Sequence, residues 1–272
     1  MKALILGANG FVGSHLAEKL ARGGNAVSAA YNTKSSQIPS GCKKIPVAEL
    51  YGLTEFFDHV YICVGNFSCT HEEFVSQAIE IYHIIKQLRY DRVVFVSSIA
   101  VYGSHAGIIS YQSEFATPSL YGQYKLACEF LLTSLPNCSI VRFTYLYGPG
   151  MSENSLIPRW INTAKTNGVI AVYGDGARAQ DYLYIDDAIS LIIKTASEKI
   201  LPPFIAASGV SISNRDLAYL LAELIPDTKI EFTGSDSSAS FFFDISFTKK
   251  ELQWMPTVDL RTGLTRLLTT CE

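Results

Sequence analysis

The strongest constraint on the fold is a cluster of three glycines near the start of the sequence. Gly7, Gly10 and Gly13 follow the short apolar run "KALIL", and from Phe11 onward apolar residues recur at roughly helical spacing. In a strand–turn–helix unit the first glycine permits a tight turn, the second lets backbone approach a phosphate, and the third lets the helix press on the strand. The amino end of that helix presents unpaired N–H groups and a partial positive charge. A plain glycine-rich turn would look similar, but the context favours a site for the pyrophosphate of a dinucleotide.

Strand-length apolar runs alternate with amphipathic segments in the first half of the sequence. "KALILG", "NAVSAAY", "VYICVG" and "DRVVFVSS" have the pattern of strands buried on both faces, and "HEEFVSQAIEIYHIIKQL" that of a helix. This alternation predicts an α/β fold with a doubly wound parallel sheet of the Rossmann type. Past residue 150 the pattern loosens. We therefore expect a dinucleotide-binding domain over 1–150 and a smaller, mainly substrate-binding lobe over 151–272, from which some segments return to the first domain.

Composition narrows the classes of partner. The net charge of −3 offers no electrostatic reason to bind nucleic acid or an anionic membrane. The sequence has no 18-residue apolar stretch, and its six cysteines form no C-x-x-C pair, so neither a membrane span nor a metal site is expected. Cysteines inside apolar runs, such as Cys63, suit a reducing compartment. These features predict a cytoplasmic protein.

Two segments further along carry groups suited to proton and hydride chemistry. In "PSLYGQYKLACEF", Tyr121 and Lys125 are four residues apart and share one face of a predicted helix. A nearby lysine cation, helped by an oxidised nicotinamide, would lower the tyrosine pKa and allow proton exchange near neutral pH. In "VVFVSSIAVYG", Ser98 ends a predicted buried strand, where the ligand crevice of a doubly wound sheet forms. The simpler interpretations are an exposed helix face for the pair and strand-end capping for Ser97 and Ser98.

Taken in this order, the motifs resemble the extended branch of the short-chain dehydrogenase/reductase superfamily, which includes the NAD-dependent epimerases and dehydratases. The G-x-x-G-x-x-G turn, the S-S-x-x-V-Y-G segment and Y-x-x-x-K carry the resemblance, and "VRFTYLYGPG", "VYGDGARAQDYLYIDDAISLI" and "ELQWMPTVDLRTGL" extend it over essentially the whole chain. It implies that Ser98 hydrogen-bonds the reacting oxygen, that Tyr121 is the acid/base, and that Lys125 lowers the tyrosine pKa and binds the nicotinamide ribose. It also implies a nucleotide-sugar substrate.

The predicted site residues fall into three sets. The catalytic set is Ser98, Tyr121 and Lys125. The cofactor-binding set is Gly7, Asn9, Gly10, Phe11, Val12, Gly13, Asn32, Lys34, Val64, Gly65, Tyr121 and Lys125. The substrate set is Ser98, Tyr145, Arg178 and Gln180.

The end of the second predicted strand departs from the family pattern. Members that use NAD commonly carry an acid there, bonded to the adenosine ribose, whereas this chain runs "VSAAYNTKSS". Asn32 and Lys34 could receive a 2′-phosphate that a carboxylate would repel. The cofactor is therefore NAD or NADP, with a weak preference for NADP.

Further departures bear on the reaction and the substrate. Ile99 and Ala100 stand where 4,6-dehydratases typically carry Asp-Glu, and they cannot exchange protons, which argues against dehydration. C4 epimerisation or 4-ketone reduction remains. Gln180 replaces an arginine that normally meets the substrate diphosphate, although Arg178 lies two residues away, and Tyr145 replaces a frequent asparagine. These changes leave open a reductase of a non-nucleotide carbonyl compound, or a non-catalytic NADP-binding regulatory protein.

Two predicted helices bear on the oligomeric state. The helices predicted around 72–89 and 119–135 carry apolar faces at the place where similar proteins often pair. The resemblance therefore implies a homodimer, although the isoleucines of the first helix could equally be core residues.

Overall fold

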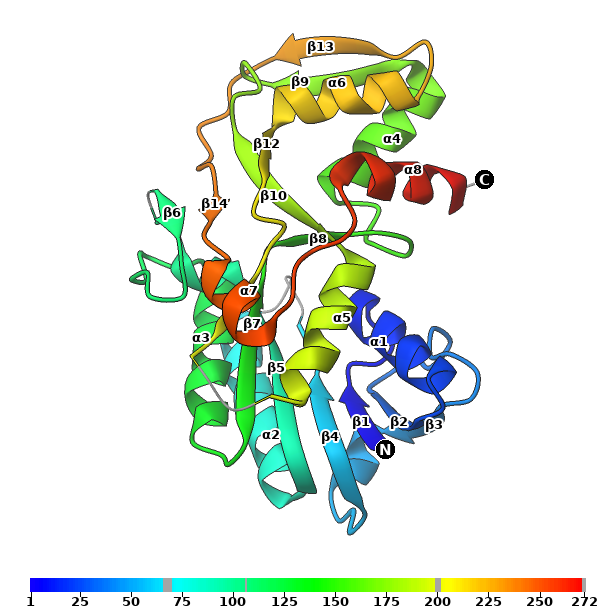
Figure 1. Cartoon of the computed structure of the whole chain (residues 1–272), viewed down its shortest axis with the longest axis vertical. Helices are drawn as coiled ribbons and strands as arrows, with labels where there is room; N and C mark the ends of the chain where they lie inside the picture. Colours follow the sequence, from blue (N-terminus) through cyan, green and yellow to red (C-terminus); the bar gives the residue numbers. More distant parts are fainter. Residues whose placement is uncertain (66–69, 106, 199–201, 271–272) are drawn as a thin grey trace. The chain divides into compact units, whose positions relative to one another are not determined.

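The computed structural model of the chain describes residues 1–65, 70–105, 107–198 and 202–270. It divides into two compact units: unit 1 comprises residues 1–105, 113–143 and 189–205, and unit 2 comprises residues 106–112, 144–188 and 206–272. The chain passes between the two units several times (Figure 1).

A seven-stranded sheet forms the centre of unit 1, in the order β11-β7-β5-β4-β1-β2-β3. Its strands are β1 (Lys2–Leu6), β2 (Ala26–Tyr31), β3 (Lys43–Pro46), β4 (Phe56–Ile62), β5 (Arg89–Ser98), β7 (Cys138–Phe143) and β11 (Phe204–Ala206). All pairings from β3 across to β7 are parallel. On one side of β1 the sheet continues with β2 and β3, and on the other side it continues with β4, β5 and β7. The prediction of a doubly wound α/β fold is confirmed.

Helices cover the sheet. They are α1 (Phe11–Arg22), α2 (His71–Gln87) and α3 (Leu120–Thr133), with short 3-10 helices at Val47–Leu50 and Ile99–Tyr102. Because β1→β2 and β4→β5 run in opposite directions with right-handed crossovers, α1 and α2 lie on opposite faces. α2 and α3 are neighbours (Figure 1). Their apolar residues pack on one cluster with Leu4, Leu6 and Phe95 of the sheet.

Helix boundaries follow local sequence signals. Thr70 caps α2: its side chain accepts a hydrogen bond from the Glu73 N–H, and the Glu73 carboxylate accepts one from the Thr70 N–H. Ser119 caps α3 in a similar way by accepting from the Gly122 N–H. The second cap matters for function because it sets where the helix carrying Tyr121 begins.

Unit 2 contains small sheets and helices. Its strands are β6 (Ile108–Ile109), β8 (Tyr145–Tyr147), β9 (Val169–Tyr173), β10 (Ala179–Tyr184), β12 (Ser211–Ser213), β13 (Lys229–Thr233) and β14 (Phe242–Phe243). They pair as β12-β10-β8, β13-β9 and β14-β6. The helices are α4 (Leu156–Asn167), α6 (Asn214–Leu224), α7 (Ser246–Leu252) and α8 (Leu260–Thr270), while α5 (Ile185–Ala196) begins in unit 2 and ends in unit 1. Among the described helices, none is long and apolar enough to cross a bilayer.

Candidate active site

The glycine turn lies between β1 and α1, as the sequence predicts. Gly7 has a φ of +80°, which suits glycine, and a Cβ atom there would lie 3.0 Å from the backbone of Cys63, just after β4. A Cβ atom at Gly13 would lie 2.1 Å from the Gly7 carbonyl oxygen, so α1 presses directly on the turn. Gly10 is the N-cap of α1 and provides no side-chain cap, and no acidic residue lies in the first turn. The amino end of α1 is therefore suited to an anion.

Tyr121 and Lys125 of α3 meet at the loop that follows β4. A Cβ atom added at Gly65 would lie 3.3 Å from both the Tyr121 Oη and the Lys125 Nζ. The carboxyl ends of β1 and β4 form the topological switch point of the sheet, which is where ligands bind in folds of this kind. The phenol, the ammonium and the glycine turn are thus grouped at the carboxyl edge of the sheet.

Lys125 is deeply buried and held by backbone oxygens. It is 2% exposed, and its Nζ donates to the carbonyls of Val64 at 2.8 Å and Val96 at 2.9 Å. The ammonium also lies 4.8 Å from the centre of the Phe95 ring. Burial lowers the Lys125 pKa to about 8, although nearby acidic groups act in the other direction. These contacts fix the ammonium close to the Tyr121 phenol.

The Tyr121 pKa differs from the expectation. Burial raises it above its ordinary value, and Lys125 does not bring it below that value. The physical reason is desolvation, because burial disfavours the charged phenolate, and the nearby Cys128 thiol acts in the same direction. When bound, an oxidised nicotinamide would add a second positive charge beside the phenol.

Ser98 stands at the last position of β5 and caps the following 3-10 helix. Its Oγ accepts a hydrogen bond from the Ala100 N–H at 3.1 Å. The capping role predicted as the simpler interpretation is therefore present. This hydrogen bond occupies one lone pair of Ser98 Oγ, so the hydroxyl proton can still be donated to a substrate oxygen.

The remaining predicted cofactor residues lie at the same edge of unit 1. Val64 follows β4 and packs partly on the core cluster, and Asn9 is half-buried in the glycine turn beside Phe11 and Val12 of α1. Asn32 and Lys34 are exposed just beyond β2.

Of the predicted substrate residues in unit 2, Tyr145 lies on β8, Gln180 on β10 and Arg178 just before β10. Tyr145 is 40% exposed and pairs in register with Tyr182, whose hydroxyl is buried and has no hydrogen-bond partner within the described part of the chain. Gln180 is buried, and its Nε2 donates to Asn214 Oδ1 at 3.2 Å. Arg178 is half-buried and donates from Nε to a backbone carbonyl at 3.3 Å.

Comparison with known proteins shows which family has this combination of fold and residues. Residues 3–202 of this chain match the model of the NAD dependent epimerase/dehydratase family. The chain belongs to this family. The resemblance to extended short-chain dehydrogenase/reductases is confirmed, and the chain is an enzyme of a family that acts on nucleotide sugars and depends on NAD.

Relatives match along nearly the full length. A Bacillus subtilis protein described as an uncharacterized UDP-glucose epimerase is 25% identical, over 97% of this chain and 96% of its own. The structure of a UDP-glucose 4-epimerase from Thermotoga maritima with UDP-glucose superposes with a TM-score of 0.88 at 19% identity, covering 100% of both chains. The structure of an NAD-dependent NDP-hexosamine 5,6-dehydratase of tunicamycin biosynthesis superposes with a TM-score of 0.87 at 22% identity, covering 99% of this chain and 97% of that one. At these identities the structures show a shared fold.

The cofactor of the epimerase/dehydratase family fits the residues present. The uncapped amino end of α1 can hold its pyrophosphate, while the side-chain-free Gly65 leaves room beside Tyr121 and Lys125 for the nicotinamide ribose. No group of three or more His, Cys, Asp or Glu within the described residues has a geometry that could hold a metal ion.

Gly122 lies in the candidate site and is not among the residues predicted from the sequence. A Cβ atom there would lie 2.2 Å from the Ala100 carbonyl oxygen, so the start of α3 sits directly on the 3-10 helix that follows Ser98. This contact links the segment carrying Tyr121 to the one carrying Ser98. A glycine inside a helix costs about 1 kcal/mol relative to alanine. Its presence in the predicted helix therefore indicates a close contact at that position.

We expect Gly122→Ala to lower kcat by about a hundredfold, because the added methyl group forces α3 away from the Ser98 segment. Steady-state kinetics of the folded variant would measure this. Ala127→Ser, at an exposed position of α3, is the control. Wild-type kcat in a folded Gly122→Ala protein would show that the contact does not set the site geometry.

Proposed function

We propose that this chain is a UDP-sugar 4-epimerase that transfers hydride reversibly at C4 of its substrate. The observation that carries the proposal is the meeting of Tyr121 Oη and Lys125 Nζ at Gly65, at the switch point of a Rossmann sheet. The names of the relatives support the substrate class, since they include a UDP-glucose epimerase and a UDP-glucose 4-epimerase.

The side chains would divide the chemistry as follows. Tyr121 Oη would accept the proton of the C4 hydroxyl as C4 loses its hydride to NAD. It would return that proton to the same oxygen when hydride comes back to the opposite face of the turned C4 ketone. Ser98 Oγ donates a hydrogen bond to the same oxygen, and Lys125 holds a positive charge beside the phenol. NAD, when bound, supplies the hydride acceptor. Ile99 is buried and apolar directly after Ser98, so a second acid/base pair for dehydration is missing there.

A direct test is to incubate the purified protein and NAD with UDP-glucose, UDP-glucuronic acid and UDP-N-acetylglucosamine in separate reactions. Nuclear magnetic resonance of the anomeric proton would reveal the C4 epimer. One epimerised sugar supports the proposal. Recovery of every sugar unchanged from NAD-loaded protein would contradict it, and would return attention to the non-catalytic cofactor-binding alternative.

A reductase of a non-nucleotide carbonyl compound is the second candidate, and Gln180 favours it. This residue is neutral, buried and already bonded to Asn214, so it offers no charged fork to a diphosphate. In the epimerase proposal Arg178 and the exposed phenol of Tyr145 take over substrate contact. NADPH oxidation with keto sugars and simple ketones would favour the reductase, provided that no UDP-sugar is epimerised.

The choice between NAD and NADP is part of the proposal. The family relation favours NAD, whereas the end of β2 has Asn32 and Lys34 and no carboxylate to repel a 2′-phosphate. We expect NAD to bind and NADP to bind within about tenfold of it. Lys34→Glu should weaken NADP selectively. Calorimetric titration of both cofactors checks this, and an NADP Kd unaffected by Lys34→Glu would remove Lys34 from the site.

Assembly as a homodimer through α2 and α3 also remains a proposal. Ile81, Ile84 and Ile85 are buried core residues. Ile79 and Phe130 are exposed on α2 and α3, at 45% and 80%, and support such a contact. Sedimentation of the purified protein would measure its mass in solution.

A further inference from the structure

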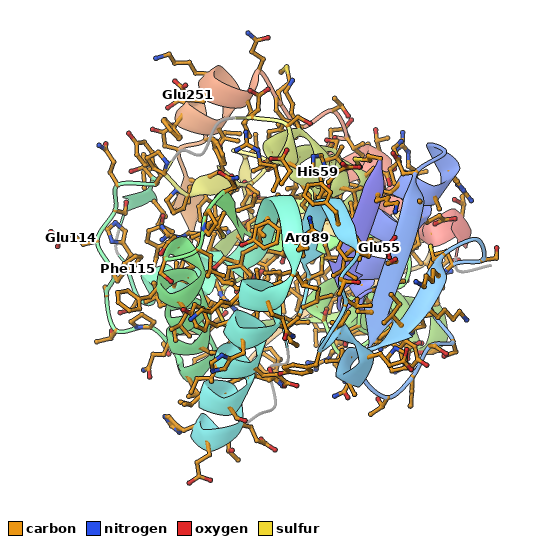
Figure 2. The ribbon with its side chains drawn as sticks, turned by 90° about the horizontal axis from the view of Figure 1, so that it is seen from below. Glu55, His59, Arg89, Glu114, Phe115 and Glu251 are labelled. Carbon is orange, nitrogen blue, oxygen red and sulfur yellow. The ribbon has the colours of Figure 1, made fainter. Side chains whose placement is uncertain are left out.

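Glu129 of α3 and Arg142 of β7 form a buried ion pair inside unit 1. Arg142 Nε and Nη2 donate to the two carboxylate oxygens at 3.0 and 2.6 Å, and Ser97 Oγ of β5 donates a third bond at 2.5 Å. Arg142 Nη1 also donates to Tyr102 Oη at 2.7 Å. The guanidinium carbon lies 5.0 Å from the Tyr102 ring centre and 5.2 Å from that of Phe115, which Figure 2 labels on the segment beside α3.

Three residues of this network, Glu129, Ser97 and Tyr102, lie on the segments that carry the proposed site. Glu129 lies two turns beyond Tyr121 on the same helix, with Lys125 between them. Ser97 immediately precedes Ser98 on β5. Tyr102 ends the 3-10 helix that begins just after Ser98. The carboxylate therefore connects the helix that carries the acid/base to the strand that carries the serine.

Stability alone is a poor explanation for such a pair. Burying two charges costs free energy that their attraction often only offsets, and well-packed apolar residues of similar volume frequently do as well or better. Charged partners add geometric specificity. A bidentate guanidinium–carboxylate pair with further hydrogen bonds restricts how the helix and strands that carry it can be arranged.

We propose that the Ser97–Glu129–Arg142–Tyr102 network is the positioning element that sets the distance between Ser98 on β5 and Tyr121 on α3. Its residues act through Ser98, Tyr121 and Lys125 and do not contact substrate. The inference rests on the proposed function for its kinetic readout. Its geometric content can be tested without a substrate.

Ser97→Ala is the first test because it removes one hydrogen bond with only a small change in packing volume. We expect kcat to fall about tenfold with KM unchanged within about twofold, since a small displacement of reacting groups lowers the rate more than it lowers binding. Ser139→Ala is the matched control: Ser139 is also buried, on the neighbouring strand β7. An equal kcat for the two variants would overturn the proposal.

The ion pair itself provides the second test. Glu129→Gln should lower both Tm and kcat, because it leaves the buried Arg142 charge uncompensated. In the double variant Glu129→Leu/Arg142→Met we expect Tm to recover toward the wild-type value while kcat stays at least about tenfold low. Joint recovery of Tm and kcat would show that the pair serves only stability.

A substrate-free measurement separates this inference from the proposed function. In NAD-loaded protein, ultraviolet absorbance of tyrosinate can be titrated, and subtraction of the Tyr121→Phe curve isolates Tyr121. We expect Ser97→Ala, and not Ser139→Ala, to raise the apparent Tyr121 pKa by about half a unit, because α3 no longer holds the phenol beside Lys125. That shift would support the positioning role even if no UDP-sugar is turned over, and identical titrations would contradict it.

Discussion

Tyr121→Phe should lower kcat by about a thousandfold while leaving the Kd for the cofactor within about threefold of wild type. The variant removes only the hydroxyl whose oxygen meets Lys125 Nζ at Gly65, so it deletes the proton-transfer group without enlarging or shrinking the site. The other residues proposed to bind the cofactor, those of the glycine turn and Lys125, are unchanged in this variant. Steady-state kinetics and calorimetric titration would measure the two quantities.

Tyr124→Phe is the control for this variant. Tyr124 is a second buried tyrosine on α3, and its ring stacks on Phe74 at 4.6 Å. Loss of its hydroxyl alters helix packing to a similar degree without touching the proposed acid/base. Similar kcat values for Tyr121→Phe and the wild type, or an equal loss in both variants, would remove Tyr121 from the chemistry.

Gly13→Ala should destabilise the protein by about 2–3 kcal/mol and abolish measurable cofactor binding. The new Cβ atom would lie 2.1 Å from the Gly7 carbonyl oxygen and 2.9 Å from the Ala8 Cα, which are both backbone atoms that cannot move without opening the turn. Separation of α1 from the turn also withdraws the helix amino end from the pyrophosphate. Denaturant unfolding and calorimetry would check both effects.

Gly10→Ala separates the two consequences. Its Cβ atom would lie 3.4 Å from the Gly7 carbonyl oxygen, an ordinary contact, so we expect a loss of stability of about 1 kcal/mol or less. Cofactor affinity should still fall by tenfold or more, because the methyl group occupies the space where the phosphate approaches the backbone. Equal stability losses for the two variants would show that helix-to-turn packing does not distinguish Gly13.

Much of unit 1 could be predicted because its signals are local. The apolar runs ending at Leu6, Tyr31 and Ser98 became β1, β2 and β5, and the periodic segment after Thr70 became α2. Strands buried on both faces and helices buried on one face differ in periodicity, and periodicity is visible in a short window of sequence. The spacing of the glycines likewise identified the turn, and Gly7 and Gly13 each have a steric reason to lack a side chain.

The relations between distant residues could not be predicted in this way. Glu129 receives hydrogen bonds from Ser97 and Arg142, which are 32 and 13 residues away, and a charged residue on an amphipathic helix is ordinarily solvent-exposed. Its burial follows from the packing of α3 against β5 and β7. The Tyr121 pKa is a second case, because desolvation depends on the surroundings of the phenol and not on its spacing from Lys125.

The amino-acid sequence by itself therefore determined the fold class and the glycine turn, because these depend on residue types and on spacings within one element. For the same reason it predicts which groups exchange a proton. Only the tertiary structure decided that Lys125 is held by the Val64 and Val96 carbonyls, that Gly122 lies against Ala100, and that a buried ion pair joins α3 to the sheet. Such contacts arise where elements remote in sequence pack together, and close packing, with the desolvation that accompanies it, selects which of many possible partners actually meet.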